Sequence, residues 1–118
     1  MVFSILVLSP PPGGSAAAAL RFVEAALAGG HVVRQVFFHA GGVAAAVGVD
    51  LPAGEPDLDA AWARLAGVHG FPLLACETAL ARRGLDAALR PSAAVRAGTL
   101  GQFIVALGES DRLLEFVD

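Results

Sequence analysis

One side chain with intrinsic nucleophilicity, the thiol of Cys76, falls at the carboxyl end of a predicted strand. It ends the apolar run 71–75 and comes directly before a predicted short helix over residues 77–83. The unpaired N–H groups and the dipole at a helix N-terminus favour a thiolate, whereas the neighbouring Glu77 opposes it by like-charge repulsion. The sequence has no second cysteine, so no internal disulfide can form and a covalent cycle at Cys76 must finish on another molecule. The alternative is that Cys76 is a small buried apolar residue at a strand end, because free cysteine is among the most buried residue types.

Three other polar features are weaker candidates. Arg82 and Arg83 are able to hold an anionic ligand, or they form the ordinary basic C-terminus of the helix that Gly84 ends. His39 follows a predicted strand and is expected near Cys76, where it either tunes the thiol or is a hydrogen-bonded edge residue. The loop over residues 10–15 joins a strand to a helix, but it lacks both G-x-G-x-x-G and the lysine of a P-loop, which disfavours nucleotide binding.

The remaining histidines show no pattern of a metal site. His31 follows a Gly-Gly turn and is expected to be exposed, and His69 lies at the C-terminal end of a predicted helix. No spacing among the three histidines, the cysteine and the acidic residues fits a metal site. We therefore expect neither a metal nor an organic cofactor.

The order of the predicted elements indicates an α/β fold. Apolar runs predict strands over residues 2–8, 32–38, 71–75, 94–97 and 112–117, and the first is apolar on both faces, as in buried parallel sheets. Between them we expect helices over residues 15–28, 60–68 and 77–83, a short helix within 39–49, a loop over 50–59, and a helix from a Thr99 cap to about residue 107. Ser15 is expected to cap the first helix, and Asp57 or Asp59 the helix from residue 60. These elements predict a three-layer α/β/α domain over residues 1–118, with a mostly parallel five-stranded sheet.

Composition and charge exclude several classes of protein. Hydrophobic residues make up 56% of the 118 residues and charged residues 16%, which excludes an intrinsically disordered chain. The formal net charge is −3, and the sequence has no run of basic residues that could bind along a phosphate backbone. Nucleic acid is therefore not an expected direct ligand. The uncharged stretch over residues 35–49 is too short to cross a bilayer, and no secretory signal is visible. A single cysteine fits a reducing compartment, so a cytoplasmic protein without membrane contact is expected.

Short motifs in a fixed order run through nearly the whole chain. They are Phe22-Val23-Glu24-Ala25-Ala26-Leu27, Gly30-His31, Val36-Phe37-Phe38, Gly42-Val43, Pro56-Asp57-Leu58-Asp59, Trp62, Leu73-Leu74-Ala75-Cys76, Ala79 with Arg82-Arg83-Gly84, and Ser110-Asp111-Arg112. In this order they resemble the DsrE family, and within it the TusD/DsrE sulfur-relay subunits.

The resemblance implies a sulfurtransferase whose family cysteine, matched here by Cys76, carries a persulfide. It implies assembly with related DsrE-family subunits, typically as a homo- or hetero-oligomeric hexamer, and transfer of sulfur to a small acceptor of the TusE/DsrC type. The pathway so served is either 2-thiouridine formation in tRNA or dissimilatory sulfur oxidation.

Two other functions stay open on the sequence. The first is a non-catalytic scaffold subunit of a sulfur-relay complex, because a chain with only 16% charged residues offers apolar faces for burial between subunits. The second is a flavodoxin-like nucleotide-binding module that uses the loop over residues 10–15.

Overall fold

The computed structural model describes residues 1–11, 13–48, 58–89 and 94–118. The elements are β1 (Val2–Val7), α1 (Ser15–Ala28), β2 (Val32–Phe38), α2 (Gly42–Val47), α3 (Asp59–His69), β3 (Leu73–Cys76), α4 (Glu77–Arg82), the 3₁₀ helix η1 (Asp86–Ala88), β4 (Val95–Gly98), α5 (Leu100–Gly108) and β5 (Arg112–Phe116). Most of the predicted loop 50–59, including Asp57, lies outside the described residues.

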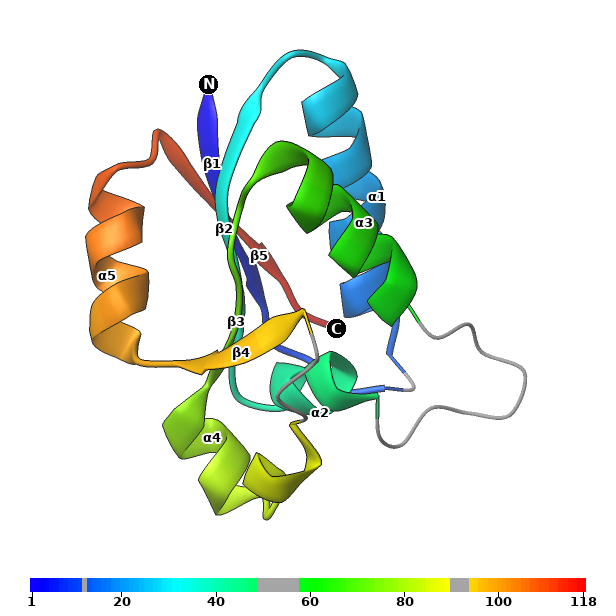
Figure 1. Cartoon of the computed structure of the whole chain (residues 1–118), viewed down its shortest axis with the longest axis vertical. Helices are drawn as coiled ribbons and strands as arrows, with labels where there is room; N and C mark the ends of the chain where they lie inside the picture. Colours follow the sequence, from blue (N-terminus) through cyan, green and yellow to red (C-terminus); the bar gives the residue numbers. More distant parts are fainter. Residues whose placement is uncertain (12, 49–57, 90–93) are drawn as a thin grey trace.

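Within the described residues, five strands form one sheet in the order β4-β3-β2-β1-β5. Each pairing between neighbouring strands is parallel, which confirms the predicted α/β class. The chain steps outward from β1 to β4 and then returns to the far side of β1. Because crossovers between parallel strands are right-handed, the return connection through α5 must lie on the opposite face from the outward connections. Figure 1 shows this arrangement, with α1 and α3 on one side of the sheet and α5 on the other.

The central strand β2 explains why apolar residues occupy consecutive positions. Successive side chains of a strand point to opposite faces, so Phe37 and Phe38 pack into different layers. The Phe38 ring meets Trp62 of α3 edge to face at 5.9 Å between ring centroids, and the Phe37 ring lies 5.0 Å from Phe103 of α5. Both phenylalanines are essentially fully buried. The strand therefore joins the two halves of the core.

Two predicted helix caps are wrong. Ser15 is the first residue of α1 rather than its cap, which is Gly14, and the Ser15 hydroxyl donates to the backbone oxygen of Ser9 at 3.1 Å. The preceding loop folds back far enough for Ser9 to become the partner. Helix α3 begins at Asp59 itself, and its capping position is Leu58, whose side chain makes no capping hydrogen bond.

The N-terminus of α5 is fixed by the predicted Thr99 cap. The Thr99 hydroxyl accepts a hydrogen bond from the Gln102 backbone N–H at 3.0 Å, and the Gln102 carboxamide oxygen accepts one from the Thr99 N–H at 2.7 Å. This reciprocal pair is a capping box. It anchors the helix at the point where the chain leaves β4.

Replacing Thr99 with alanine is expected to lower the free energy of unfolding by about 1 kcal/mol, because one capping hydrogen bond is lost. Gln102→Ala removes the other half of the box, so the double variant should lose less than the sum of the two single losses. Urea unfolding of the three variants measures this. Strictly additive losses would mean that the two hydrogen bonds act independently.

Candidate active site

Cys76 lies where a strand becomes a helix. It is the last residue of β3 and the capping position of α4, and it is in register with Gly98, the last residue of β4. Its side chain is only 1% exposed. A reagent therefore has to approach the sulfur through a pocket rather than from open solvent.

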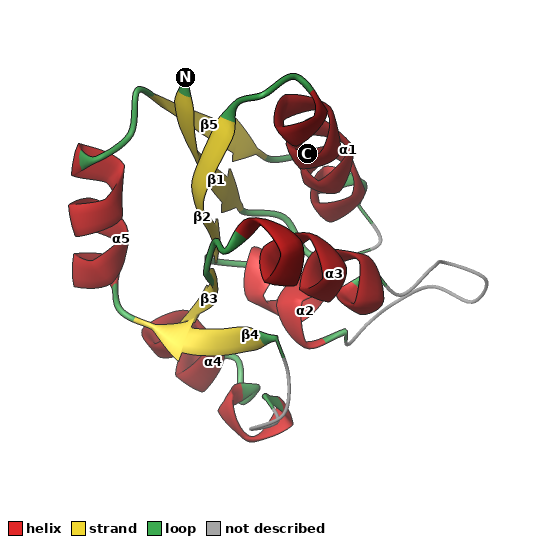
Figure 2. Ribbon diagram, turned by 45° about the horizontal axis from the view of Figure 1, so that its top comes forward, coloured by secondary structure: helices red, strands yellow, loops and turns green. Residues whose placement is uncertain are grey.

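The position of β3 in the sheet favours a site at this end. The connection that follows β2 leads to α3 on one face, whereas the connection that follows β4 leads to α5 on the other (Figure 2). Cys76 ends the strand between them. Ligands of open α/β sheets gather outside the carboxyl ends of strands where the connections diverge in this way.

A pocket of about 300 Å³ brings together the side chains that the sequence singled out. Its lining includes His39 after β2, Cys76 at the end of β3, Thr78, Arg82 and Arg83 from α4 and its end, and Leu100 from the start of α5. The predicted proximity of His39 and Cys76 is thus confirmed. The pocket combines a thiol, an imidazole and two guanidinium groups.

His39 is held in a tight turn. Its Nδ1 atom is buried and has no hydrogen-bond partner among the described residues. Ala40, which follows, has a φ of 50°, a left-handed conformation that alanine adopts only at a cost of about 1 kcal/mol. The backbone N–H of Gly42 closes the turn onto the oxygens of His39 and Leu8, at 2.9 and 3.1 Å. The turn fixes the imidazole at the edge of the pocket.

Arg82 and Arg83 combine both roles proposed for them. Arg82 lies in the last turn of α4 and Arg83 at its C-terminal cap, as expected for a basic helix end. Both residues also line the Cys76 pocket. Both side chains are exposed, and neither has an ion-pair or hydrogen-bond partner in the part of the chain that the structure describes. Their charge is therefore available to an anion that enters the pocket.

The other candidates lie elsewhere. His31 is exposed, and its Nδ1 lies 3.3 Å from the N-terminal nitrogen of Met1. His69 is exposed at the end of α3. Neither histidine lines the Cys76 pocket. No group of three or more metal-ligating side chains occurs among the described residues.

Comparison with known proteins decides the family. The sequence model of the DsrE/DsrF-like family matches residues 1–116. The chain belongs to this family. This DsrE/DsrF-like chain is 39% identical to a sulfurtransferase TusD homolog of Pseudomonas aeruginosa, over 98% of the chain and 97% of that protein. It is 38% identical to the sulfurtransferase TusD of Serratia proteamaculans, over 81% of the chain and 83% of that protein.

A solved structure supports the fold of this family member. The crystal structure of the ychN protein from E. coli superposes with a TM-score of 0.76, covering 98% of the chain and 97% of that protein at 18% identity. In the described residues of our structure, no helix has both the length and the apolar character needed to cross a membrane.

Sequence reasoning missed Thr78 and Leu100 as pocket residues of this DsrE/DsrF-like protein. Thr78 had a local signal, since it comes two residues after the cysteine in the first turn of the helix. Leu100 had none, because its place depends on the register between β3 and β4 and on the face to which α5 returns.

Proposed function

We propose that this protein is a sulfurtransferase subunit, a single DsrE-like domain over residues 1–118 that carries a persulfide on Cys76. The observation that carries the proposal is the place of the only cysteine, in a pocket at the carboxyl edge of the sheet. The near-full-length similarity to proteins named sulfurtransferase TusD supports the same activity.

The reaction moves one sulfur atom without net oxidation. The Cys76 thiolate attacks the outer sulfur of a donor persulfide, a new S–S bond forms, and the donor leaves as a thiolate that takes up a proton. The products are Cys76–S–SH and the donor thiol. An acceptor thiolate then attacks the outer sulfur of Cys76–S–SH, and Cys76 leaves as the thiolate. The steps need no metal or organic cofactor.

The surroundings of Cys76 suit a transient anion. Arg82 and Arg83 bring positive charge to the pocket, and His39 adds an imidazole ring to its lining. The sulfur anions that form on attack and on departure are stabilised by these groups. The low exposure of the thiol limits access by oxidants from solvent.

The subunit acts within an assembly in this proposal. Related DsrE-family subunits form the oligomer, a hexamer in the typical case, and a protein of the TusE/DsrC type accepts the sulfur in the cytoplasm. The sulfur then serves tRNA 2-thiolation or sulfur oxidation, according to the partners present.

One observation favours the alternative of a non-catalytic scaffold subunit, namely the 1% exposure of Cys76. Alkylation of the native protein with iodoacetamide separates the two functions. A carrier reacts to completion at one group per chain, through the pocket. A scaffold subunit is protected when native and reacts only after addition of denaturant, and that result would overturn the proposal.

Arg83→Gln is expected to slow the loading of Cys76 from glutathione persulfide, an anionic donor, by about threefold at low ionic strength, because local positive charge raises the donor concentration at the pocket. Added salt should reduce the difference, since charges are screened over about 10 Å at 0.1 M. The rate of mass gain measures the loading.

Arg64→Gln is the matched control, because Arg64 is an exposed cation of α3 that does not line the pocket. Equal slowing in both variants would show an effect of net charge alone and would contradict a local role for Arg83.

A further inference from the structure

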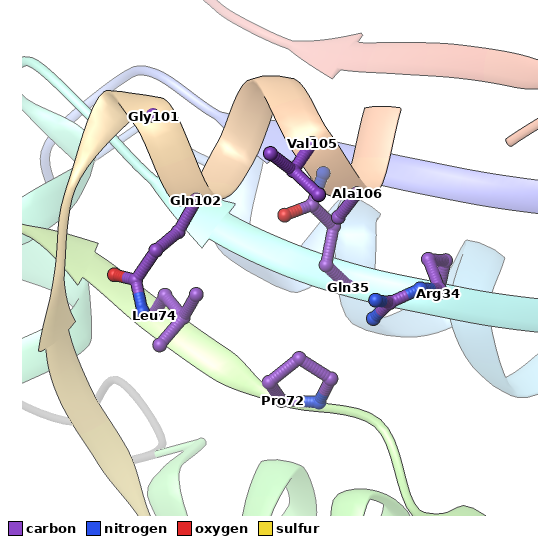
Figure 3. Close-up of a pocket in the computed structure, with 8 residues that line it drawn as sticks. All are labelled: Arg34, Gln35, Pro72, Leu74, Gly101, Gln102, Val105 and Ala106. Carbon is purple, nitrogen blue, oxygen red and sulfur yellow. The ribbon is translucent and has the colours of Figure 1, made fainter. Parts of the chain in front are cut away.

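A second, larger depression of about 540 Å³ lies between α5 and the neighbouring strands. Figure 3 shows its lining, in which Pro72 and Leu74 come from the β3 side, Val105 and Ala106 from α5, and Gln35 from β2. We call this depression the α5 groove. Its walls are mainly apolar, and no described part of the chain fills it.

Gln35 supplies an unused hydrogen-bond acceptor at this groove. The residue is fully buried, and its Nε2 donates to the Ser4 hydroxyl at 3.0 Å and to the Phe103 backbone oxygen at 3.1 Å. A carbonyl oxygen only accepts, so the nitrogen must face Phe103 and the orientation of the carboxamide is fixed. The Oε1 atom has no partner among the described residues. Figure 3 shows it directed toward the side of the groove where Leu74 and Gln102 lie.

The outer surface of α5 continues the apolar walls of the groove. Leu100 is 49% exposed, Ile104 60% and Val105 68%. A small molecule in the groove would leave this surface uncovered, whereas a polypeptide laid over the helix would bury it. Contiguous exposed apolar residues of this kind mark protein-interaction surfaces.

The α5 groove leads to the Cys76 pocket. Residues i and i+2 of a strand share a face, so Pro72, Leu74 and Cys76 follow one another on the α5 side of β3. On α5, Leu100 lines the Cys76 pocket while Gly101 and Gln102 line the groove. Leu74 and Pro72 precede Cys76 by two and four residues, which corresponds to about 7–13 Å along an extended strand. A polypeptide in the groove thus places its next few residues at the sulfur.

We propose that the α5 groove docks the polypeptide partner that exchanges sulfur with Cys76, and that the anchor is a tryptophan or tyrosine whose N–H or O–H donates to Gln35 Oε1. The proposal rests on the proposed function. An aromatic ring matches the apolar walls, and a single polar hydrogen matches the single buried acceptor, the combination for which these two residues are favoured at interfaces. The oxygen is covered in the free protein, so the ring reaches it by displacing side chains that line the groove.

A second copy of this chain does not supply the anchor. The sequence has no tyrosine, and its one tryptophan, Trp62, is 4% exposed and packs on Phe38 at the opposite face of the sheet. The partner is therefore a different polypeptide.

The test uses short thiol peptides as sulfur acceptors. Cys76 is first loaded from glutathione persulfide, and the loaded protein is mixed with Ac-Trp-Gly-Gly-Cys-NH₂ or with Ac-Ala-Gly-Gly-Cys-NH₂, each also in reverse order. Three residue steps span about 10 Å when extended, enough to reach from the groove to the pocket. One order of the tryptophan peptide should remove sulfur about tenfold faster than its alanine counterpart, because anchoring raises the effective thiol concentration. Equal rates in both orders would overturn the groove proposal.

Two variants locate the effect. Val105→Glu places a charge in the groove and should lower the rate of the tryptophan peptide to that of the alanine peptide. Val68→Glu is the matched control, since Val68 of α3 is 74% exposed and lies away from the groove on the other side of the sheet, and it should change neither rate. The alanine peptide reports the intrinsic reactivity of Cys76 in each variant. Equal loss in both variants would contradict the assignment.

Indole and 1-methylindole test the hydrogen bond to Gln35. Indole should shift the NMR signals of the Gln35 carboxamide and of the Leu74 and Val105 methyl groups. 1-Methylindole, which lacks the N–H, should bind about fivefold more weakly. Equal affinities of indole and 1-methylindole would overturn the proposed hydrogen bond to Gln35.

If Cys76 takes up no sulfur at all, the proposed function fails and the role of the groove in sulfur exchange fails with it. If Cys76 takes up sulfur but the tryptophan and alanine peptides remove it at equal rates, only the groove proposal fails.

Discussion

A Cys76→Ser variant is expected to take up no sulfur from glutathione persulfide, while the wild type gains one sulfur atom per chain. The chain has no other cysteine, so no second thiol is available to form the S–S bond of a persulfide. A hydroxyl does not replace it, because thiol–disulfide exchange requires an attacking thiolate. Intact-mass spectrometry before and after treatment with a reductant measures the gain and its reversal.

The fold of this variant should be retained, which makes the loss of loading interpretable. Cys76 occupies the capping position of α4, where serine is among the preferred residues. The circular dichroism spectrum and the urea midpoint of the variant should stay close to those of the wild type. A reducible gain of sulfur on the folded serine variant would contradict the assignment of Cys76.

Gly42→Ala is expected to lower the free energy of unfolding by about 3 kcal/mol, at the upper end of the cost of overpacking. A Cβ atom at this position would clash with the oxygen of the Val7 backbone carbonyl and lie 2.7 Å from its carbon. Backbone atoms of a central strand do not move aside as a flexible side chain does. The turn that carries His39 would have to shift, so sulfur loading should slow as well. Urea unfolding and the loading rate check the two effects.

Gly67→Ala is the matched control for this substitution. Gly67 lies within α3, and a Cβ atom there meets nothing within 4 Å. Because alanine is a better helix former than glycine, this variant should be more stable than the wild type by about 1 kcal/mol. A similar loss of stability in both variants would contradict the close approach of Gly42 to β1.

The sequence was sufficient to predict the fold because its signals are local. The five apolar runs and the Thr99 cap each depend on neighbouring residues, and the structure confirms them. The Ser15 and Asp59 caps were wrong by one residue, because each is the first residue of its helix and the capping positions are Gly14 and Leu58. The Ser15 hydroxyl bonds the Ser9 backbone instead, and acidic residues such as Asp59 are also favoured in the first turn of a helix, so residue type alone does not mark the cap.

The pocket was predictable only in part. Cys76 and His39 come at the ends of neighbouring parallel strands, so their proximity follows from the strand–helix–strand order. The place of Leu100 and the unpartnered oxygen of Gln35 depend on strand register and on the packing of α5 over β2. Those are contacts between residues far apart in the sequence, and residue spacing alone does not encode them.

The measurement that tests the central claim most directly is the intact mass of the wild-type protein through one cycle of sulfur transfer. The protein is treated with glutathione persulfide, freed of the donor, weighed, mixed with a thiol acceptor and weighed again. We expect a gain of one sulfur atom, its loss to the acceptor as a persulfide, and the same gain on a second exposure to the donor. No gain by a folded protein, or a sulfur that no thiol removes, would contradict the role of Cys76 as a carrier.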